Sequence, residues 1–381
     1  MLVTIGLYSL ALLAYVYLGY PLLVYLVAAL LPNQRTSQVA GIQLPAPQSV
    51  SIVIAVRNAE RQILEKLRNT AEICQNATAL RTQIIVASDA SDDRTDDLVR
   101  DQPGVLLSRI ETRGGKESAQ QAALEVATGD VVLFTDVRTK LEPGVLQNLV
   151  EYFRDPKIGA VSSVDIIEGG KLSGEALYVV YEMALRAAES RLHSLVGLSG
   201  SCFAVRRSLT AGIRNDICSD FALMMHCRKQ GFRGVSAPDV RCAYGVVSSE
   251  GQEFQRKLRT VLRGMRALFT FPEMLNPFRY GVFALQLASH KLGRWLVPFF
   301  LIGAIAGLFP LARVHWIYAL LLTGGLLLPA LALLGYFAPQ QRSKIWVKLP
   351  TFFVLSNLAI LTAWFYLLTG HKMVTWTPTQ T

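Results

Sequence analysis

Two short apolar runs in this chain each end in an aspartate. Residues 83–88 lead into Asp89, and residues 131–135 lead into Asp136. Short β-branched and aromatic stretches bounded by polar turns are typical of buried strands in a parallel sheet. In open α/β sheets, ligands bind in the crevice beyond the carboxyl ends of the strands. The two carboxylates therefore predict a polar ligand site at that edge.

Two further positions could contribute chemistry, each with an ordinary structural alternative. Residues 113–116, Arg-Gly-Gly-Lys, precede a predicted helix and would bring a cation and free N–H groups together, as phosphate sites do; an ordinary turn explains them equally well. Asp220 opens a helix and either caps it or acts as a general base facing a cleft. For Asp89, capping is the alternative, but Ser91 or Asp92 could cap the next helix without it.

The elements that must position these residues alternate between strand and helix from residue 49 onward. Strands are predicted at 51–55, 83–88, 105–110, 131–135 and 202–206, and helices at 60–75, 92–101, 117–127, 173–194 and 220–230. Such alternation is typical of βαβ units and a mostly parallel sheet. We therefore predict an α/β domain over residues 50–253.

The ends of the chain are too apolar for a purely soluble protein. Hydrophobic residues make up 51% of the 381 residues, and residues 2–31 contain no charged side chain. At ~1.5 Å per residue, such a helix exceeds the ~30 Å hydrocarbon core of a bilayer. We predict a transmembrane helix over 1–31 and three more within 293–370, at 293–311, 315–338 and 349–370.

Charges near these segments predict their orientation. Basic residues gather in the 338–348 loop, and Arg35 follows the first span within a polar, proline-rich linker, residues 32–49. By the positive-inside rule, both lie in the cytoplasm, as expected for an integral protein of the bacterial inner membrane. A short tail, 371–381, follows the last span. The net charge of +10 suits a membrane-surface protein with anionic substrates, although charge alone would suit nucleic acid equally.

Residues 254–292 are predicted to form amphipathic helices at the membrane interface. Their arginines recur at helical spacing, opposite an apolar face: Arg256, Arg259, Arg263 and Arg266 against Leu258, Val261, Leu262, Met265 and Phe269. Two readings remain open: the arginines extend toward lipid phosphates, or one of them reaches a substrate diphosphate. The five scattered cysteines show no metal-binding spacing and predict reduced thiols.

As a set, these residues resemble the family 2 glycosyltransferases, inverting enzymes of GT-A fold, and in particular the membrane-integrated synthases of hyaluronan, chitin and cellulose. The turn 89–93 is similar to the family's Asp-Gly-Ser-x-Asp turn, whose first aspartate contacts uracil. Gly115-Lys116 is similar to its Gly-Lys pair near the nucleotide. Asp136-Val137-Arg138 stands where the family has Asp-x-Asp, with arginine replacing the second carboxylate.

The resemblance extends to both ends of the domain. Residues 55–60 keep Asn58 and Glu60 of the family's first turn, and Asp220 matches the catalytic base of its Glu-Asp pair. Residues 256–260 match the Gln-x-x-Arg-Trp signature at Arg259 alone, which weakens any expectation of long-chain polymerisation. The resemblance implies that the nucleotide sugar is bound by Val56, Asn58, Glu60, Asp89, Lys116, Asp136, Arg138 and Arg259.

The resemblance also implies a reaction and its partners. Asp220 would deprotonate an acceptor hydroxyl that attacks a UDP-sugar, with Mg²⁺ or Mn²⁺ on Asp136 and with Arg138 partly replacing the metal. The expected acceptor is a glycan or lipid-linked saccharide at the bilayer, with a second copy or an exporter as protein partner and no nucleic acid. One alternative is a catalytically silent, sugar-nucleotide-binding subunit. A small transporter is a weaker alternative, because the predicted spans carry essentially no ionisable residues.

Overall fold

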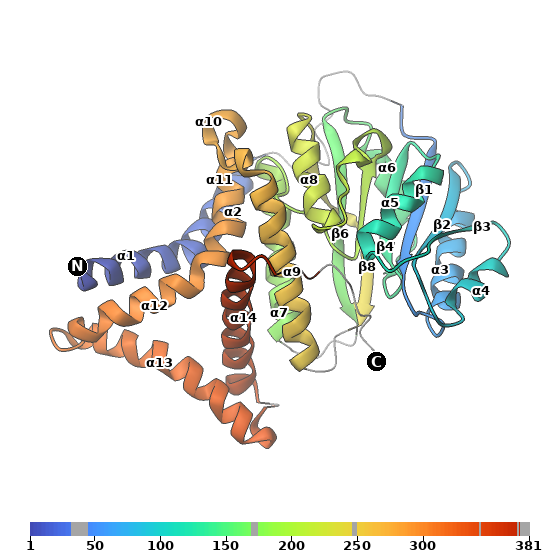
Figure 1. The fold of residues 1–381 in the computed structure, drawn as a ribbon. Helices are drawn as coiled ribbons and strands as arrows, with labels where there is room; N and C mark the ends of the chain where they lie inside the picture. The colour runs from blue at the N-terminus through green and yellow to red at the C-terminus, as the bar shows by residue number, and fades with distance from the viewer. Residues whose placement is uncertain (32–44, 169–173, 246–249, 343, 372, 374–381) are drawn as a thin grey trace.

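The computed structural model describes residues 1–31, 45–168, 174–245, 250–342, 344–371 and 373. Most of the predicted linker 32–49 and of the tail 371–381 lies outside these residues. A sheet covered by helices forms one side of the molecule, and the long apolar helices form the other (Figure 1). Helices α7 (Gly174–Leu192) and α9 (Glu250–Thr270) lie between the two parts.

One eight-stranded sheet, in the order β3-β2-β1-β4-β7-β6-β8-β5, organises the described part of the central region. Its strands are β1 (Ser49–Val56), β2 (Arg81–Asp89), β3 (Val105–Ile110), β4 (Val131–Asp136), β5 (Lys140–Leu141), β6 (Ile158–Glu168), β7 (Cys202–Arg206) and β8 (Arg233–Gly245). Strands β3, β2, β1 and β4 are parallel neighbours, whereas β7 runs antiparallel to both β4 and β6. The prediction of an α/β fold with a mostly parallel sheet is confirmed.

Helices cover both faces of the sheet because successive residues of its central strands are apolar. Ile52 and Ile54 of β1 belong to one core with residues of α3 (Ile63–Asn76) and α6 (Val145–Tyr152). Val53, between them, belongs to a second core with residues of α5 (Lys116–Val126) and α8 (Ser219–Lys229). All three side chains are fully buried. A strand covered on both faces reads as a continuous apolar run, and this is why β1 was recognisable in the sequence.

Every predicted strand and helix of this domain is present, with ends shifted by a few residues; α4, for example, spans Thr95–Arg100. Strands β5, β6 and β8 and helix α6 were missed. Polar residues interrupt β6 at Ser162, Ser163 and Asp165, and Pro238-Asp239 interrupts β8, so neither segment shows a simple apolar or alternating pattern. Short helical turns complete the description: η2 (Arg207–Gly212), η3 (Pro272–Leu275), α10 (Pro277–Tyr280) and η5 (Pro339–Gln341).

Four helical runs in the described chain are long and apolar enough to cross a membrane, as predicted. The first joins α1 (Leu2–Ala14), the π-helical turn η1 (Tyr15–Gly19) and α2 (Tyr20–Leu30); the second joins α11 (Val282–Leu287), the π-helical turn η4 (Ala288–Leu292) and α12 (Gly293–Leu311); the others are α13 (Trp316–Phe337) and α14 (Ile345–Leu368). The second run therefore begins before residue 293, its predicted start.

Helices α1 and α12 approach each other through glycine. A Cβ atom added to Gly307 would lie 2.3 Å from the Cα of Gly6, and one added to Gly6 would lie 2.5 Å from the Cα of Gly307. Only residues without a side chain permit this contact between backbones. Small residues at a crossing are typical of helix association within membranes, where close packing replaces the hydrophobic effect.

A buried cluster of charged groups joins α7 to the apolar helices. The ring of His290, in η4, lies between two carboxylates of α7, with Nδ1 2.8 Å from Glu189 Oε1 and Nε2 3.0 Å from Glu182 Oε1. Arg294 donates to Glu182 at 2.6 Å, and the Tyr20 hydroxyl donates to Glu189. The expectation that the spans carry essentially no ionisable residues is therefore wrong, because the second helical run includes η4.

Two of the four α9 arginines that could have extended toward lipid contact protein instead. Buried Arg263 forms an ion pair with Glu117 at the start of α5, and Arg266 donates to the backbone oxygen of His371 at 2.6 Å. On the other side of α9, Leu258 and Leu262 are buried in the core that includes residues of α14. Helix α9 is thus enclosed between the sheet domain and an apolar helix.

Candidate active site

The carboxyl ends of β2, β1 and β4 define the edge at which the candidate site lies. In the parallel register, Val56 pairs with Ser88, the residue before Asp89, and Ala55 pairs with Asp136. Strand β1 therefore separates the two aspartates, and at about 4.8 Å per strand their backbones lie about 10 Å apart across the sheet. A ligand of nucleotide size can touch both.

The side chain of Asp89 is held in place by backbone hydrogen bonds from the residues just before α5. Its Oδ1 accepts hydrogen bonds from the backbone N–H groups of Gly114 and Gly115, at 2.8 and 2.9 Å. Gly115 has a φ of +92°, a conformation that favours glycine. Asp89 is 1% exposed, and its Oδ2 has no hydrogen-bond partner within the described chain. A buried, unsatisfied carboxylate oxygen is costly, so Oδ2 is suited to accept a donor from a ligand.

The capping alternative for Asp89 does not hold. Asp93 Oδ1 accepts from the backbone N–H of Thr95, the first residue of α4, at 3.0 Å. Neither Asp89 nor the two residues named as alternative caps, Ser91 and Asp92, makes that contact. Asp89 is therefore free of a capping role.

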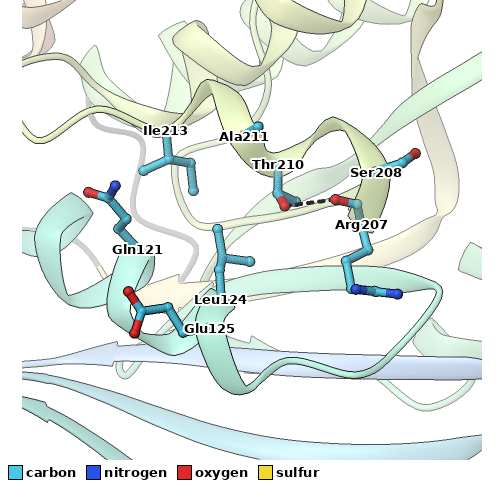
Figure 2. A pocket seen from close by; sticks show the side chains of 8 residues that line it. All are labelled: Gln121, Leu124, Glu125, Arg207, Ser208, Thr210, Ala211 and Ile213. Atoms are coloured by element: carbon cyan, nitrogen blue, oxygen red, sulfur yellow. Dashed lines mark hydrogen bonds between the residues drawn. The ribbon is translucent and has the colours of Figure 1, made fainter.

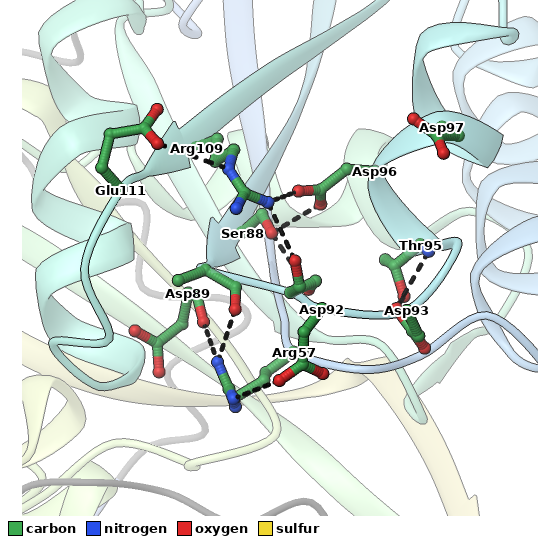
Figure 3. A network of polar contacts seen from close by, with 12 residues as sticks. Arg57, Ser88, Asp89, Asp92, Asp93, Thr95, Asp96, Asp97, Arg109 and Glu111 are labelled. Atoms are coloured by element: carbon green, nitrogen blue, oxygen red, sulfur yellow. Dashed lines mark hydrogen bonds and ion pairs between the residues drawn. The ribbon is translucent and has the colours of Figure 1, made fainter.

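The turn after β1 is joined to the turn after β2 by a polar network (Figure 3). Asn58 donates to Asp92 Oδ1 at 2.6 Å and accepts from the backbone N–H of Asp92 at 3.1 Å. Glu60 accepts from the backbone N–H of Arg94 at 3.4 Å. The side chain of Val56 is 1% exposed within the core, so a ligand could meet only its backbone. These predicted donor-site residues lie at the correct edge, and direct ligand contact stays a prediction.

Arg57 is a residue of this network that the sequence analysis missed. Its Nη1 donates to the backbone oxygens of Asp89 and Ala90, both at 2.6 Å, and its Nη2 lies 3.3 Å from Asp92 Oδ2 (Figure 3). The guanidinium thereby holds the turn that presents Asp89. An arginine directly after a buried strand was the available signal, but its partners depend on how β1 and β2 pair.

Lys116 links Asp136 to the loop that precedes β7. Its Nζ lies 2.6 Å from Asp136 Oδ1 and donates to the backbone oxygen of Gly200 at 3.0 Å. Burial acts to lower the pKa of Lys116, but Asp136 outweighs it and the net effect raises the pKa above its usual value. Asp136 therefore favours the charged ammonium form of Lys116, the first residue of α5.

Asp220 belongs to the same neighbourhood. A Cβ atom added to Gly200 would lie 3.4 Å from Asp220 Oδ2, so the carboxylate sits beside the loop that accepts from Lys116. Asp220 also contributes to the electrostatic field at the Lys116 ammonium. Its Oδ1 accepts from the backbone N–H of Phe221 at 2.9 Å, and the residue is partly exposed at the start of α8. Asp136, Lys116 and Asp220 are thus brought together from β4, α5 and α8.

The loop beside Asp220 is held by Asp165, which the sequence analysis did not single out. Its Oδ1 accepts from the hydroxyls of Ser199 and Ser201, both at 2.7 Å, and the backbone oxygen of Ser201 accepts from the N–H of Asp136 at 3.1 Å. Asp165 lies in β6, one of the missed strands, so its position depended on topology. It fixes the loop between Asp136 and Asp220.

Helix α9 contributes Arg259 to this region. Arg263, one turn later on the same face, is fixed by Glu117, the neighbour of Lys116, and donates to the backbone oxygen of Ile217 at 3.0 Å. Burial and Arg263 lower the pKa of Arg259, whereas Glu117 and Asp136 act in the opposite direction. Arg259 is therefore within electrostatic reach of Asp136.

The predicted metal site has one carboxylate. Within the described chain, no group of three or more histidine, cysteine, aspartate and glutamate residues could hold a metal ion. Asp136 is already paired with Lys116, and exposed Arg138 follows it by two residues. Mg²⁺ and Mn²⁺ prefer oxygen ligands, and nearby cations repel them, so this donor set does not fit a conventional Asp-x-Asp centre. The Mg²⁺ or Mn²⁺ expected on Asp136 stays a prediction.

A separate pocket lies away from this edge. It has a volume of about 310 Å³ and is lined by Gln121, Leu124, Glu125, Arg207, Ser208, Thr210, Ala211 and Ile213 (Figure 2). Its α5 residues are five to nine positions beyond Lys116, which places them about 8–14 Å along the helix. None of the predicted site residues lines this pocket, so it is distinct from the candidate active site.

Comparison with known proteins shows which family the sheet domain resembles. Residues 51–213 match the model of glycosyl transferase family 2. These residues, which include most of strand β1 and strands β2, β3, β4 and β7, are thus similar to that family. The matched residues include Asp89, Lys116 and Asp136, whereas Asp220 and Arg259 lie beyond them.

The chain is also similar to two bacterial proteins and to one solved structure. An N-acetylglucosaminyltransferase of Rhizobium meliloti is 28% identical over 222 residues, covering 53% of this chain and 51% of its own length. One from Bradyrhizobium diazoefficiens is 28% identical over 219 residues, covering 53% and 45%. The chain thus spans about half the length of these two relatives. A mannosyltransferase of Pyrobaculum calidifontis, solved with GDP-Man and Mn²⁺, is similar across 98% of this chain and 100% of its own, with 24% identity and a TM-score of 0.70. This likeness shows the GT-A-like fold.

Proposed function

We propose that the chain is a membrane-bound, inverting glycosyltransferase that moves a sugar from a nucleotide-diphosphate sugar to a glycan or a lipid-linked acceptor. The observation that supports this most directly is the contact of Lys116 with both Asp136 and the loop beside Asp220. It brings a cation for the diphosphate and a carboxylate for the acceptor to one edge of a glycosyl transferase sheet. Asp89, with its free oxygen, provides the nucleotide end of the same edge.

In the proposed reaction, Asp220 accepts the proton of an acceptor hydroxyl. The hydroxyl oxygen forms a bond to the anomeric carbon while the bond from that carbon to the diphosphate breaks. The electron pair of the broken bond leaves with the diphosphate, and one displacement inverts the anomeric configuration. Lys116 is proposed to stabilise the negative charge that develops on the diphosphate, an interaction that is strongest in a site already organised before reaction.

The donor is proposed to be a UDP-sugar. The two relatives named as N-acetylglucosaminyltransferases make UDP-N-acetylglucosamine the first donor to test, and the mannosyltransferase makes GDP-mannose the natural comparison. The proposed acceptor lies at the bilayer, because α9 and α7 bring the sheet domain against helices of membrane-spanning length. We further propose that the domain faces the cytoplasm of a bacterial inner membrane, where nucleotide sugars are made, and that a second copy or an exporter assists the product's passage.

The test uses the full chain purified into lipid nanodiscs. Release of UDP or GDP is measured across a panel of nucleotide sugars and with membrane extracts as acceptor source. Asp220→Asn is expected to lower turnover at least 100-fold, since general-base catalysis typically contributes that factor, while UDP binding persists. The matched control is Asp216→Asn, the same change at an aspartate that pairs with Arg214 on the surface. Nucleotide binding without turnover of any donor would instead support the silent-subunit alternative.

A further inference from the structure

Two cations, Lys116 and Arg138, accompany Asp136, the one carboxylate of the turn 136–138. Lys116 neutralises Asp136 at 2.6 Å, so the one carboxylate of the Asp-x-Arg turn has no net charge left to attract a divalent ion. Arg138, on the same turn, is exposed and has no hydrogen bond or ion pair within the described chain. A metal entering this site would have to displace an ammonium and lie near an unpaired guanidinium.

Arg259 adds a third cation from a different element. It makes no hydrogen bond or ion pair within the residues that the structure describes, yet Asp136 acts on it through space. The position of Arg259 is fixed by its neighbour, because Arg263, one turn away on the same face of α9, forms an ion pair with Glu117. Lys116, Arg138 and Arg259 therefore come from α5, the turn after β4, and α9. Within the described residues, only Lys116 forms an ion pair.

We infer that these three cations take the place of a divalent metal, so that sugar transfer proceeds with the leaving nucleoside diphosphate held by Lys116, Arg138 and Arg259 alone. This inference rests on the proposed function. Arginine binds phosphate through paired N–H groups, and both arginine and lysine are common phosphate ligands. As the bond between sugar and diphosphate breaks, the negative charge that accumulates on the diphosphate meets charges that the chain already holds in place.

The first experiment measures turnover of the full chain in nanodiscs, with the donor found in the screen, in EDTA and after adding back MnCl₂ or MgCl₂. Wild type is expected to keep its rate in EDTA within about threefold. Arg138→Asp, which restores the second carboxylate, is expected to lose at least about tenfold in EDTA and to recover with Mn²⁺, since it exchanges a fixed cation for a metal ligand. Arg154→Gln, a change at an exposed arginine that pairs with Glu151, is the control and should behave as wild type.

The second measurement is the affinity for UDP, by calorimetry, in EDTA. Arg138→Gln is expected to weaken UDP binding about tenfold, the loss typical of one hydrogen bond to a charged group. The inference is overturned if wild type is inactive in EDTA and restored by metal, although the proposed function would then stand. If no donor is turned over under any condition, the proposed function fails, and a requirement of wild-type UDP binding for Mn²⁺ would separately overturn the inference.

Discussion

The ion pair between Glu117 and Arg263 offers the sharpest test of how α9 is held against the sheet domain. Both side chains are less than 10% exposed, with 3% for Glu117 and 8% for Arg263. Glu117→Gln keeps the shape of the side chain but leaves the guanidinium buried without a counter-charge. Removing one partner of a buried pair typically costs about 3–5 kcal/mol. Because Arg263 keeps its hydrogen bond to Ile217, we expect the lower end, about 3 kcal/mol.

The measurement is thermal unfolding of the full chain in nanodiscs, followed by tryptophan fluorescence. At about 2–4 °C per kcal/mol, the apparent Tm of Glu117→Gln should fall by roughly 6–12 °C. Pairing it with Arg263→Met should recover most of that loss, because no charge is then buried alone. Glu125→Gln, an exposed position on the same helix, is the control. A Glu117→Gln protein that melts within about 1 °C of wild type would refute the assignment of this pair as a structural contact.

Two further predictions follow from other parts of the fold. Burial lowers the pKa of Lys66 from 10.5 to about 8. Between these two pH values the unfolded chain binds more protons than the folded one, so the free energy of unfolding should rise by about 3 kcal/mol as pH increases from 8 toward 10.5. Lys66→Met should flatten this rise when unfolding is measured across the same pH range. Separately, Gly307→Leu should lower the yield and apparent Tm of the protein, because any side chain at this position would meet Gly6. Gly325→Leu is the control, because the space around Gly325 is open. Equal yield and Tm for the two variants would count against the α1–α12 contact.

The sequence was most informative where a local pattern determines the structure. The apolar runs before Asp89 and Asp136 identified two strands and the edge they share. The residues that precede or begin the predicted helices located α5 and α8 together with the residues of their first turns. The four membrane-length helices were equally visible, because length and hydropathy alone identify them. These features need no knowledge of which segments meet.

The rest depended on contacts between distant segments. Asp165 lies on a strand whose polar residues concealed it, and its role appears only when the loop carrying Ser199 and Ser201 folds onto it. The spacing of the arginines in α9 is compatible with contact to lipid or to protein. For Arg263, only the ion pair with Glu117 in the folded structure shows that the contact is to protein. The pairing of Lys116 with Asp136 likewise required β4 and α5 to meet.

The histidine-centred cluster between α7 and the apolar helices has a practical consequence for anyone wishing to study the soluble part alone. A version that ends before residue 282 would retain Glu182, Glu189 and Tyr20 but lose His290, 2.8 Å from Glu189, and Arg294, 2.6 Å from Glu182. The two buried carboxylates of α7 would then lack His290 and Arg294 as partners, although α2 would still cover Leu185 and Ala188. In such a fragment both glutamates should be replaced by neutral residues, because deletion alone removes the groups that contact them in the full chain.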